Sequence, residues 1–222
     1  MVKIRVWDLP TRLFHWLLVL AVVGLIVTGN VGGAWMNWHM RLGYAVFALV
    51  LFRLVWGVWG GRWSRFVHFV PTPRRLWAYV RGQRDTQSVG HNPMGALSVL
   101  ALLAVLLLQV GTGLVSDDEI AFTGPLTSLV SADTVSWATG YHAELGKLLL
   151  LSLVALHLVA IVYHRVVKKH RLVKAMLTGY QESQPPATLE SHDNLATRLL
   201  ALVVLCICVA VVYGVIGLAT PP

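Results

Sequence analysis

Five long apolar segments recur along the 222 residues of the chain: residues 13–29, 39–60, 94–115, 142–167 and 199–219. Each is long enough, or nearly so, to cross a bilayer as a helix of about 17–25 residues. None shows the sustained alternation of apolar and polar positions that is typical of membrane strands, and leucine dominates several of them. The pattern therefore predicts an all-α protein with five transmembrane helices.

Composition supports this interpretation. Hydrophobic residues make up 56% of the chain and charged residues only 13%, more apolar surface than a soluble domain of this size could bury. The net charge of +8 would suggest nucleic acid in a soluble protein, but membrane topology explains it better here, and no nucleic-acid partner is expected. Cys206 and Cys208 lie two residues apart in one apolar segment and cannot supply a disulfide framework or a thiolate metal site.

The basic residues alternate between connectors. Three Lys or Arg residues precede the first apolar segment, six lie in residues 61–93, and six lie in residues 165–198. The connectors 30–38 and 116–141 contain none, and the second of them carries four acidic residues. The positive-inside rule then predicts a cytoplasmic N-terminus and a C-terminus outside. The first segment is longer than the core of a usual signal peptide and lacks a small-x-small cleavage site, so we expect it to remain as an anchor.

Two connectors have a recognisable character. Pro73 and the aromatic and basic residues up to Gly82 predict a short surface helix on the cytoplasmic side. Residues 181–194 are polar and contain two consecutive prolines, which indicates a flexible cytoplasmic linker. The organisation expected is a membrane core over residues 1–180, the linker 181–194, and an additional C-terminal transmembrane helix within 195–222.

Histidines are the unusual feature of the apolar segments. Ionisable residues are costly inside a membrane and are candidates for function by default. His15, His39, His142 and His157 lie within the predicted spans, and His164 lies at the cytoplasmic end of the fourth span. A single histidine near a helix end is more often an interfacial polar residue than a ligand. The four together make a stronger case because their depths match.

His142 and His157 are 15 residues apart, which is roughly 22 Å of rise and a difference of roughly 60° around a helix. His15 falls in the cytoplasmic half of the first span, near the depth of His157. His39 falls at the outer end of the second span, near the depth of His142. Two histidine pairs, one in each leaflet, suit planar macrocycles that are each held by two axial imidazoles.

Haem b fits this pattern better than the other metal centres considered. Zinc needs three or four ligands at one point, which two separate pairs do not provide. Covalently attached haem c needs a Cys-x-x-Cys-His motif, which the sequence lacks. Two non-covalent b haems, each with two histidine ligands, are therefore the predicted cofactors.

Basic and small residues near the pairs are candidate haem contacts. Arg41 and Lys147 near the outer pair, and Arg53 and Arg12 near the inner pair, could neutralise haem propionates. Arg53 follows His39 by 14 residues and lies inside the span, which is less typical of a snorkelling side chain. A ring between helices also needs small neighbours, although close helix packing explains these equally well. The candidates are Gly24, Gly29, Gly43, Gly111 and Gly113.

Several motifs along the chain are specific in combination rather than singly. They are VWDLPTRLFHW (6–16), WHMRLGY (38–44), FRLVWG (52–57), GHNP (90–93), SDDE (116–119), LH (156–157) with the later His164, and LVKAMLTG (172–179). Together they resemble bacterial cytochrome b561-like proteins, a group that includes the b-type cytochrome subunits of nickel–iron hydrogenases. The resemblance covers about residues 3–180.

The resemblance implies a four-helix transmembrane bundle with two b haems. His15 and His157 would hold the cytoplasmic-side haem, with His164 as the alternative to His157. His39 and His142 would hold the outer haem. The group's usual spacing on the fourth helix is 14 residues rather than 15, so His142 would need a rotated or looser first turn. The fifth helix lies outside the resemblance and is expected to be peripheral or to dock a partner.

The function implied is electron transfer in a bacterial inner membrane. Family members move electrons between the quinone pool and a redox protein on the outer face, such as a c-type cytochrome or a hydrogenase. The acidic outer connector could dock a basic partner. A quinone site is expected near the cytoplasmic-side haem, with His91, Arg53 or His68 as candidate contacts. Such a protein is more an electron-transfer subunit than an enzyme by itself.

Three alternatives stay open at this point. Some relatives oxidise superoxide and reduce quinone, which would make the protein an enzyme. A homodimer is compatible with the sequence. A haem-free transporter or assembly factor could use the histidines as a proton or metal path. Against this last alternative stand the depth-matched pairs and the scarcity of carboxylates within the spans, where Glu144 is the one acidic residue.

Overall fold

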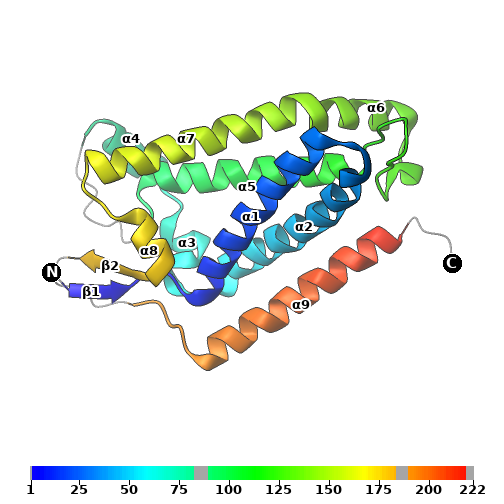
Figure 1. Ribbon diagram of the computed structural model, residues 1–222. Helices are drawn as coiled ribbons and strands as arrows, with labels where there is room; N and C mark the ends of the chain where they lie inside the picture. Colours follow the sequence, from blue (N-terminus) through cyan, green and yellow to red (C-terminus); the bar gives the residue numbers. More distant parts are fainter. Residues whose placement is uncertain (1, 83–89, 184–189, 219–222) are drawn as a thin grey trace. The chain divides into compact units, whose positions relative to one another are not determined.

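The computed structural model describes residues 2–82, 90–183 and 190–218 (Figure 1). Within these ranges, five helical segments are long and apolar enough to cross a membrane, which confirms the predicted fold class. Their principal helices are α1 (Leu9–Val31), α2 (Met36–Trp59), α5 (Pro93–Leu114), α7 (Lys147–Val166) and α9 (Leu195–Gly217). Short 3-10 turns occupy Gly33–Trp35, Arg62–Ser64 and Thr127–Leu129.

Two of these helices begin about four residues before their apolar segments because polar residues cap them. The carboxylate of Asp8 accepts the backbone N–H of Thr11 at 2.8 Å, and α1 starts at Leu9. The side-chain oxygen of Asn194 accepts the backbone N–H of Thr197 at 2.9 Å, and α9 starts at Leu195. A capping side chain satisfies an otherwise unpaired N–H of the first turn, so the helix extends into polar sequence that hydropathy does not detect.

The fourth span begins earlier than the sequence indicates. Helix α6 (Ala132–Gly140) starts after Ser131, whose hydroxyl accepts the N–H of Thr134 at 3.3 Å. A π-helical turn over Tyr141–Gly146 follows and leads into α7. A π turn takes up one residue more than an α turn. The additional residue between His142 and His157 is accommodated there, which is the loosened turn expected at His142.

Contacts divide the chain into two units. The first comprises Met1–His15, Arg53–Ala101 and Val154–Val204. The second comprises Trp16–Phe52, Leu102–Leu153 and Leu205–Pro222. Each of the five long helices therefore contributes one end to each unit. His15, His157 and Arg53 belong to the first unit, and His39 and His142 belong to the second.

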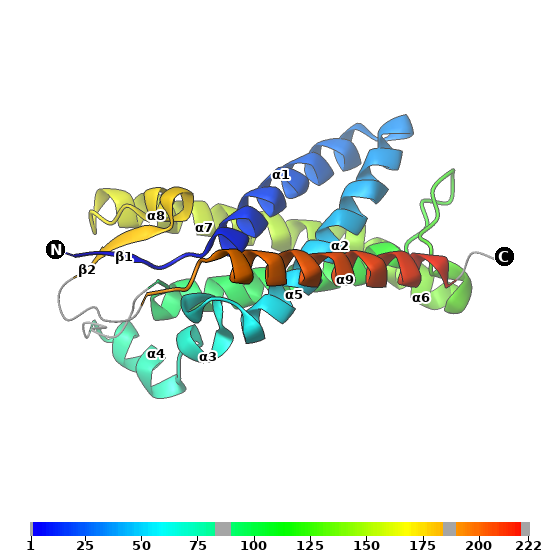
Figure 2. The same ribbon diagram turned by 90° about the horizontal axis from the view of Figure 1, so that it is seen from below.

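In the first unit, a strand at the start of the chain pairs with a strand that begins at residue 180. Strand β1 (Val2–Arg5) runs antiparallel to β2 (Tyr180–Ser183), with Arg5 opposite Tyr180. Helix α8 (Leu172–Thr178) lies beside this pair (Figures 1 and 2). A cluster of buried side chains joins the start of the chain to α8: Ile4, Val6, Trp7 and Ala175.

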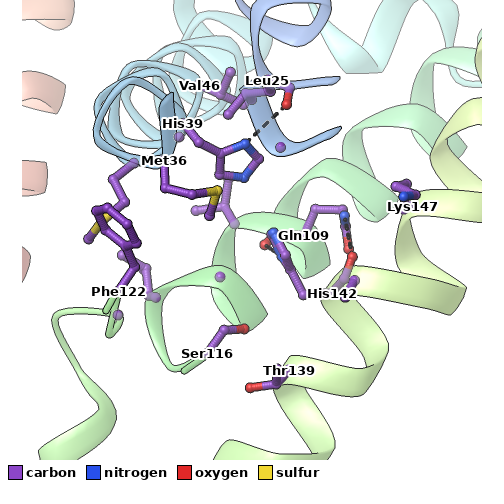
Figure 3. A pocket seen from close by; sticks show the side chains of 18 of the residues that line it. Leu25, Met36, His39, Val46, Gln109, Ser116, Phe122, Thr139, His142 and Lys147 are labelled. Carbon is purple, nitrogen blue, oxygen red and sulfur yellow. Dashed lines mark hydrogen bonds between the residues drawn. The ribbon is translucent and has the colours of Figure 1, made fainter. Parts of the chain in front are cut away.

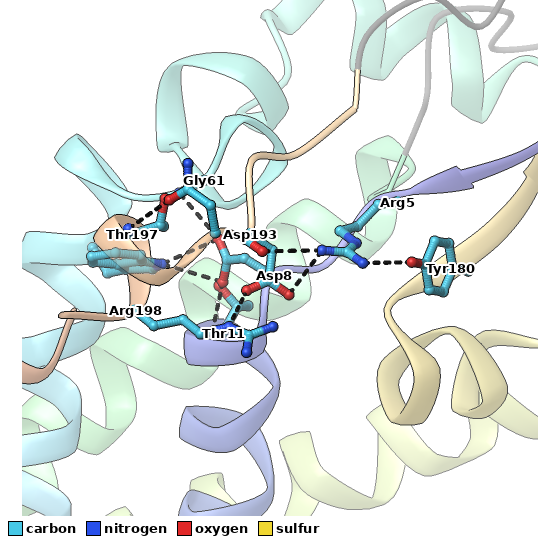
Figure 4. Close-up of polar contacts among 10 residues, drawn as sticks. Arg5, Asp8, Thr11, Gly61, Tyr180, Asp193, Thr197 and Arg198 are labelled. Carbon is cyan, nitrogen blue, oxygen red and sulfur yellow. Dashed lines mark hydrogen bonds and ion pairs between the residues drawn. The ribbon is translucent and has the colours of Figure 1, made fainter. Parts of the chain in front are cut away.

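Both described ends of the predicted linker, residues 181–183 and 190–194, make contacts in the structure. Residues 181–183 belong to β2, and the hydroxyl of Ser191 donates to the carbonyl of Val6 at 2.8 Å. Asp193 forms ion pairs with Arg5 at 3.3 Å and Arg198 at 2.8 Å (Figure 4). Residues 184–189 of the predicted linker lie outside the described residues. The polar composition reflects these ionic contacts, which tie the start of α9 to the N-terminal strand.

The predicted surface helix is present as α4 (Pro73–Val80). The side chain of Thr72 accepts the N–H of Arg75, and Pro73 occupies the first turn, where its missing N–H costs nothing. Trp77 is exposed, and the Arg81 guanidinium lies 4.8 Å from its ring centroid. The short helix α3 (Phe66–Phe69) precedes α4 and buries Phe69.

Candidate functional site

His39 and His142 face each other within the second unit. His39 comes from the first turn of α2, and His142 from the π-helical turn. Their ring centroids are 6.0 Å apart and their planes lie at 85° (Figure 3). The structure thus brings together the two histidines that the sequence paired at the outer depth.

A cavity of about 310 Å³ surrounds this pair. Apolar side chains form much of its wall, among them Leu25, Val46, Leu106 and Leu150. Polar groups that include Ser116, Asp117, Thr139 and Lys147 also line it. An apolar cavity with a few convergent polar groups is the usual form of a cofactor site.

Each of the two imidazoles is oriented by a backbone carbonyl. Nδ1 of His39 lies 3.0 Å from the carbonyl oxygen of Leu25, and Nδ1 of His142 lies 2.9 Å from that of Gln109. A carbonyl can only accept, so Nδ1 carries the proton and donates in both rings. Nε2 then bears the lone pair in both rings. This is the tautomer that binds a metal, and the hydrogen bond on the other nitrogen fixes it.

Two of the five glycines expected near the haems lie against these rings. A Cβ atom at Gly29 would stand 3.0 Å from the ring of His39, and one at Gly113 would stand 2.9 Å from the ring of His142. Gly24 instead packs against Leu42, as in ordinary helix contacts. A Cβ at Gly43 or Gly111 would meet nothing within 4 Å, although Gly43 does line the cavity.

Gln109 is a site residue that the sequence analysis did not assign. Its backbone carbonyl accepts from Nδ1 of His142, and its side-chain amide donates to the carbonyl of His142 at 3.2 Å. A Cβ at Gly146 would overlap the amide of Gln109, so this glycine leaves room for it. The signal in the sequence was that Gln109 is the only large polar residue of its apolar segment.

In the first unit, His15 and His157 lie close enough to interact electrostatically. His91 interacts with both of them and with Arg53. The His91 ring is enclosed by Trp7 and Phe69, whose ring centroids are 4.7 and 4.8 Å away. Burial and the neighbouring charges of Arg53, His157 and His15 lower the pKa of His91 to about 3. This histidine is therefore neutral at physiological pH.

The arginines proposed as propionate partners differ in their surroundings. Arg53 is 3% exposed, and its guanidinium carbon lies 4.9 Å from the ring centroid of Phe66. Its Nη1 atom is buried and has no hydrogen-bond partner among the described residues. Arg41 is exposed and lies over the ring of Trp38 at 5.2 Å, outside the wall of the cavity. Lys147 does line the cavity, and its ammonium group is 3.5 Å from the side-chain oxygen of Asn30.

The remaining candidates are engaged elsewhere. His164 lies 3.2 Å from the amide of Asn92 and stacks on His170 at a centroid distance of 5.6 Å. His68 faces Trp63 at 6.4 Å. Burial and the charges of Arg65 and Arg62 lower the pKa of His68.

The second unit fits a haem held by two axial histidines. The ring centroids are 6.0 Å apart. This is close to the length of two iron–nitrogen bonds of about 2 Å each, judged from other metal–histidine bonds, plus the distance from each Nε2 atom to its ring centroid. Both rings have the tautomer that such a bond requires. Across the described residues, no three His, Cys, Asp or Glu side chains converge on one point. In the first unit, the buried unpaired nitrogen of Arg53 suits an anionic group such as a propionate.

Comparison with known proteins relates the chain to b-type cytochromes. The family model described as prokaryotic cytochrome b561 matches residues 6–179. No solved structure was found to match.

Three curated relatives illustrate the family. A protein of Escherichia coli K12 named "Probable Ni/Fe-hydrogenase 1 B-type cytochrome subunit" is 26% identical, with 79% of this chain and 89% of the relative covered. The "Probable Ni/Fe-hydrogenase B-type cytochrome subunit" of Azotobacter vinelandii is also 26% identical, with 80% and 88% covered. The protein of the same name from Rhodobacter capsulatus is 21% identical, with 81% of each chain covered. With most of its length matched, the chain belongs to the prokaryotic cytochrome b561 family of multi-pass membrane b-type cytochromes, whose function is electron transport.

Proposed function

We propose that this protein is a cytochrome with two b haems that carries electrons between membrane quinone and a redox protein on the outer face. The observation that carries the proposal is the His39–His142 pair, with ring centroids 6.0 Å apart and both Nδ1 atoms bound to carbonyls. When bound, haem supplies a one-electron Fe(III)/Fe(II) couple. With His39 and His142 as its two iron ligands, a haem held here would have no open position for oxygen and would serve electron transfer.

The second haem is assigned to His15 and His157 in the first unit. The support is their electrostatic contact and the presence of buried Arg53 in the same unit. A buried guanidinium nitrogen without a hydrogen-bond partner is costly unless an acceptor meets it, and a haem propionate would do so. Arg41 and Lys147 are the corresponding proposal for the outer haem, and of the two Lys147 has the stronger support because it lines the cavity.

Quinone is proposed to exchange electrons near His15 and His157. His91 is half-buried and interacts with both histidines, and its buried Nδ1 atom has no hydrogen-bond partner among the described residues. A neutral imidazole can donate to or accept from a quinone oxygen. This role for His91, supported by its buried Nδ1 atom and its neighbours, is stronger than the one expected for His68, which faces Trp63.

The outer partner is proposed to be a basic redox protein, such as a c-type cytochrome or a hydrogenase. Asp117 and Asp118 line the cavity of the His39–His142 pair, and Glu119 follows them in the same exposed loop. Three backbone N–H groups, of Ile120, Ala121 and Phe122, bind the Asp118 carboxylate, and together they lower the pKa of Asp118. Negative charge beside a haem site would steer a positively charged partner towards it. The relatives are named as subunits of Ni/Fe hydrogenases, which supports a partner of this kind.

Spectroscopy of the purified full-length protein tests the proposal. We expect a reduced α-band of the b type after dithionite, and two haems per chain by the pyridine haemochrome assay. One haem per chain would refute the second site. A colourless preparation from cells with ample haem would refute the cytochrome function and favour the haem-free alternative. Oxidation of superoxide coupled to quinone reduction would reassign the protein as an enzyme.

Reporter fusions test the orientation proposed from the loop charges. A reporter after Pro222 should be active on the outer side of the bacterial inner membrane, and one inserted after Arg75 on the cytoplasmic side. The opposite pattern would exchange the faces assigned to quinone and to the redox partner.

A further inference from the structure

The two histidines of the second unit are held by the same local arrangement on two different helices. His39 lies against residues 25–29 of α1, and His142 lies against residues 109–113 of α5. In each case a carbonyl is followed three residues later by threonine and four residues later by glycine: Leu25, Thr28 and Gly29, and Gln109, Thr112 and Gly113. We call each such threonine–glycine pair a Thr–Gly step.

The glycine of each step lets the imidazole approach the helix. The ring of His39 lies 3.0 Å from the position that a Cβ of Gly29 would take, and the ring of His142 lies 2.9 Å from the position that a Cβ of Gly113 would take. Contacts this short are tighter than side chains normally accept, and the rings cannot retreat without losing their carbonyls. Glycine therefore allows Nδ1 to reach a carbonyl that is otherwise enclosed within a helix.

The threonine of each step lies beside the same Nδ1 atom. The hydroxyl of Thr28 donates to the carbonyl of Gly24 at 2.7 Å, and that of Thr112 donates to the carbonyl of Leu108 at 2.7 Å. With its proton committed to the helix, each hydroxyl presents lone pairs to the histidine. The Oγ1–Nδ1 distances are 3.4 Å for Thr28 and His39 and 3.5 Å for Thr112 and His142. Each Nδ1–H thus has a carbonyl as its main acceptor and a hydroxyl as a second, longer one.

We propose that the two Thr–Gly steps are positioning devices that hold both axial ligands of the outer haem and tune its reduction potential. The inference rests on the proposed function and assigns roles to Thr28, Gly29, Thr112 and Gly113. Acceptors on Nδ1–H increase the basicity of the ligating Nε2. A more basic ligand favours Fe(III), so the steps lower the potential of the outer haem.

Threonine variants test the tuning role. In Thr28→Val and Thr112→Val the shape is kept and the hydroxyl is lost. In Thr28→Ser and Thr112→Ser the hydroxyl stays. We expect potentiometric titration of the purified protein to show an upward shift of one haem in each valine variant, with the other haem unchanged. The serine variants should restore the wild-type potential.

Glycine variants test the holding role. Gly29→Ala and Gly113→Ala should each lose one of two haems in the haemochrome assay, or change the electron paramagnetic resonance signal of one low-spin haem. Gly111→Ala is the matched control. Gly111 lies two residues before Gly113 on α5, and a Cβ there meets nothing within 4 Å. The remaining haem, held in the first unit, reports that each variant has folded.

The outcomes separate this inference from the proposed function. Wild-type protein without haem would refute the proposed function itself. Wild-type protein with two haems, together with glycine variants that keep both haems at unchanged potentials, would overturn the holding role. Valine and serine variants with equal potentials would overturn the tuning role. If a glycine variant loses both haems, the threonine series decides, because the valine substitutions keep the shape of the step.

Discussion

The side-chain amide of Asn92 donates from Nδ2 to Nε2 of His164 at 3.2 Å. The orientation of the amide is fixed, because its oxygen accepts the backbone N–H of Gly95 at 2.7 Å at the start of α5. The lone pair of Nε2 in His164 is thereby engaged in a hydrogen bond within the first unit. A histidine in this state is a poor candidate for an iron ligand, whereas His157 has the electrostatic contact with His15.

Replacing His157 and replacing His164 should therefore have unequal effects on haem content. We expect His157→Ala to lose the haem of the first unit and to keep the outer haem, because His39 and His142 remain. His164→Ala should keep both haems, since it removes only the contacts with Asn92 and His170. Haem content and the reduced spectrum of each purified variant check this. Loss of a haem from His164→Ala, with two haems in His157→Ala, would move the ligand seven residues along α7.

Arg53 should raise the potential of the haem next to it. A buried cation stabilises the reduced, less positive haem, so Arg53→Gln should lower the midpoint potential of one haem by tens of millivolts, a shift on the order of 1 kcal/mol. Arg53→Lys keeps the charge and should shift it less. Arg41→Gln is the exposed counterpart and should have a smaller effect than Arg53→Gln. A redox titration in which Arg41→Gln has the larger effect would contradict the assignment.

Asp8 should be essential for stability. Its carboxylate is fully buried and accepts from the backbone N–H groups of Thr11 at 2.8 Å and Gly61 at 3.1 Å (Figure 4). It also accepts from the indole N–H of Trp56 at 3.3 Å and from the hydroxyl of Ser64 at 3.3 Å. Asp8→Ala leaves several buried donors unsatisfied, at a cost of about 2–5 kcal/mol. Thermal unfolding in detergent measures this loss. Exposed Asp133 provides the control, and equal melting of Asp8→Ala and Asp133→Asn would contradict the prediction.

The Asp193 ion pairs predict a pH dependence. Burial raises the pKa of Asp193, but the hydrogen bond from Arg198 and the charges of Arg198, Arg5 and Arg12 outweigh it and lower the pKa overall. A lowered pKa in the folded state gives stability that is present above the unfolded pKa of about 3.9 and is lost as the pH falls through the folded value.

We expect Asp193→Asn to cost about 1–3 kcal/mol at pH 7, as for hydrogen bonds to charged groups. The difference from wild type should shrink as the pH falls below about 4. Melting curves of both proteins between pH 7 and pH 3 provide the measurement. A constant difference over this range would show that the ion pairs do not account for the effect.

The sequence by itself determined the spans and the ligand candidates. Hydropathy identifies all five long helices because a membrane helix must present about 20 apolar residues to lipid, whatever it packs against. The four histidines stand out for the same reason, since a titratable group in such a segment is rare. The pairing of His39 with His142 followed from helix rise and topology alone.

Only the tertiary structure decided how the site is built. The π-helical turn at His142, the cap at Asp8 and the anchoring of residues 190–194 depend on hydrogen bonds to residues that are distant in sequence or that carry no hydropathy signal. The Thr–Gly steps are two residues long and look like ordinary small residues of a membrane helix. Their role appears when a histidine from another helix donates to the carbonyl beside them, because that contact joins residues 14 and 33 positions apart in the chain.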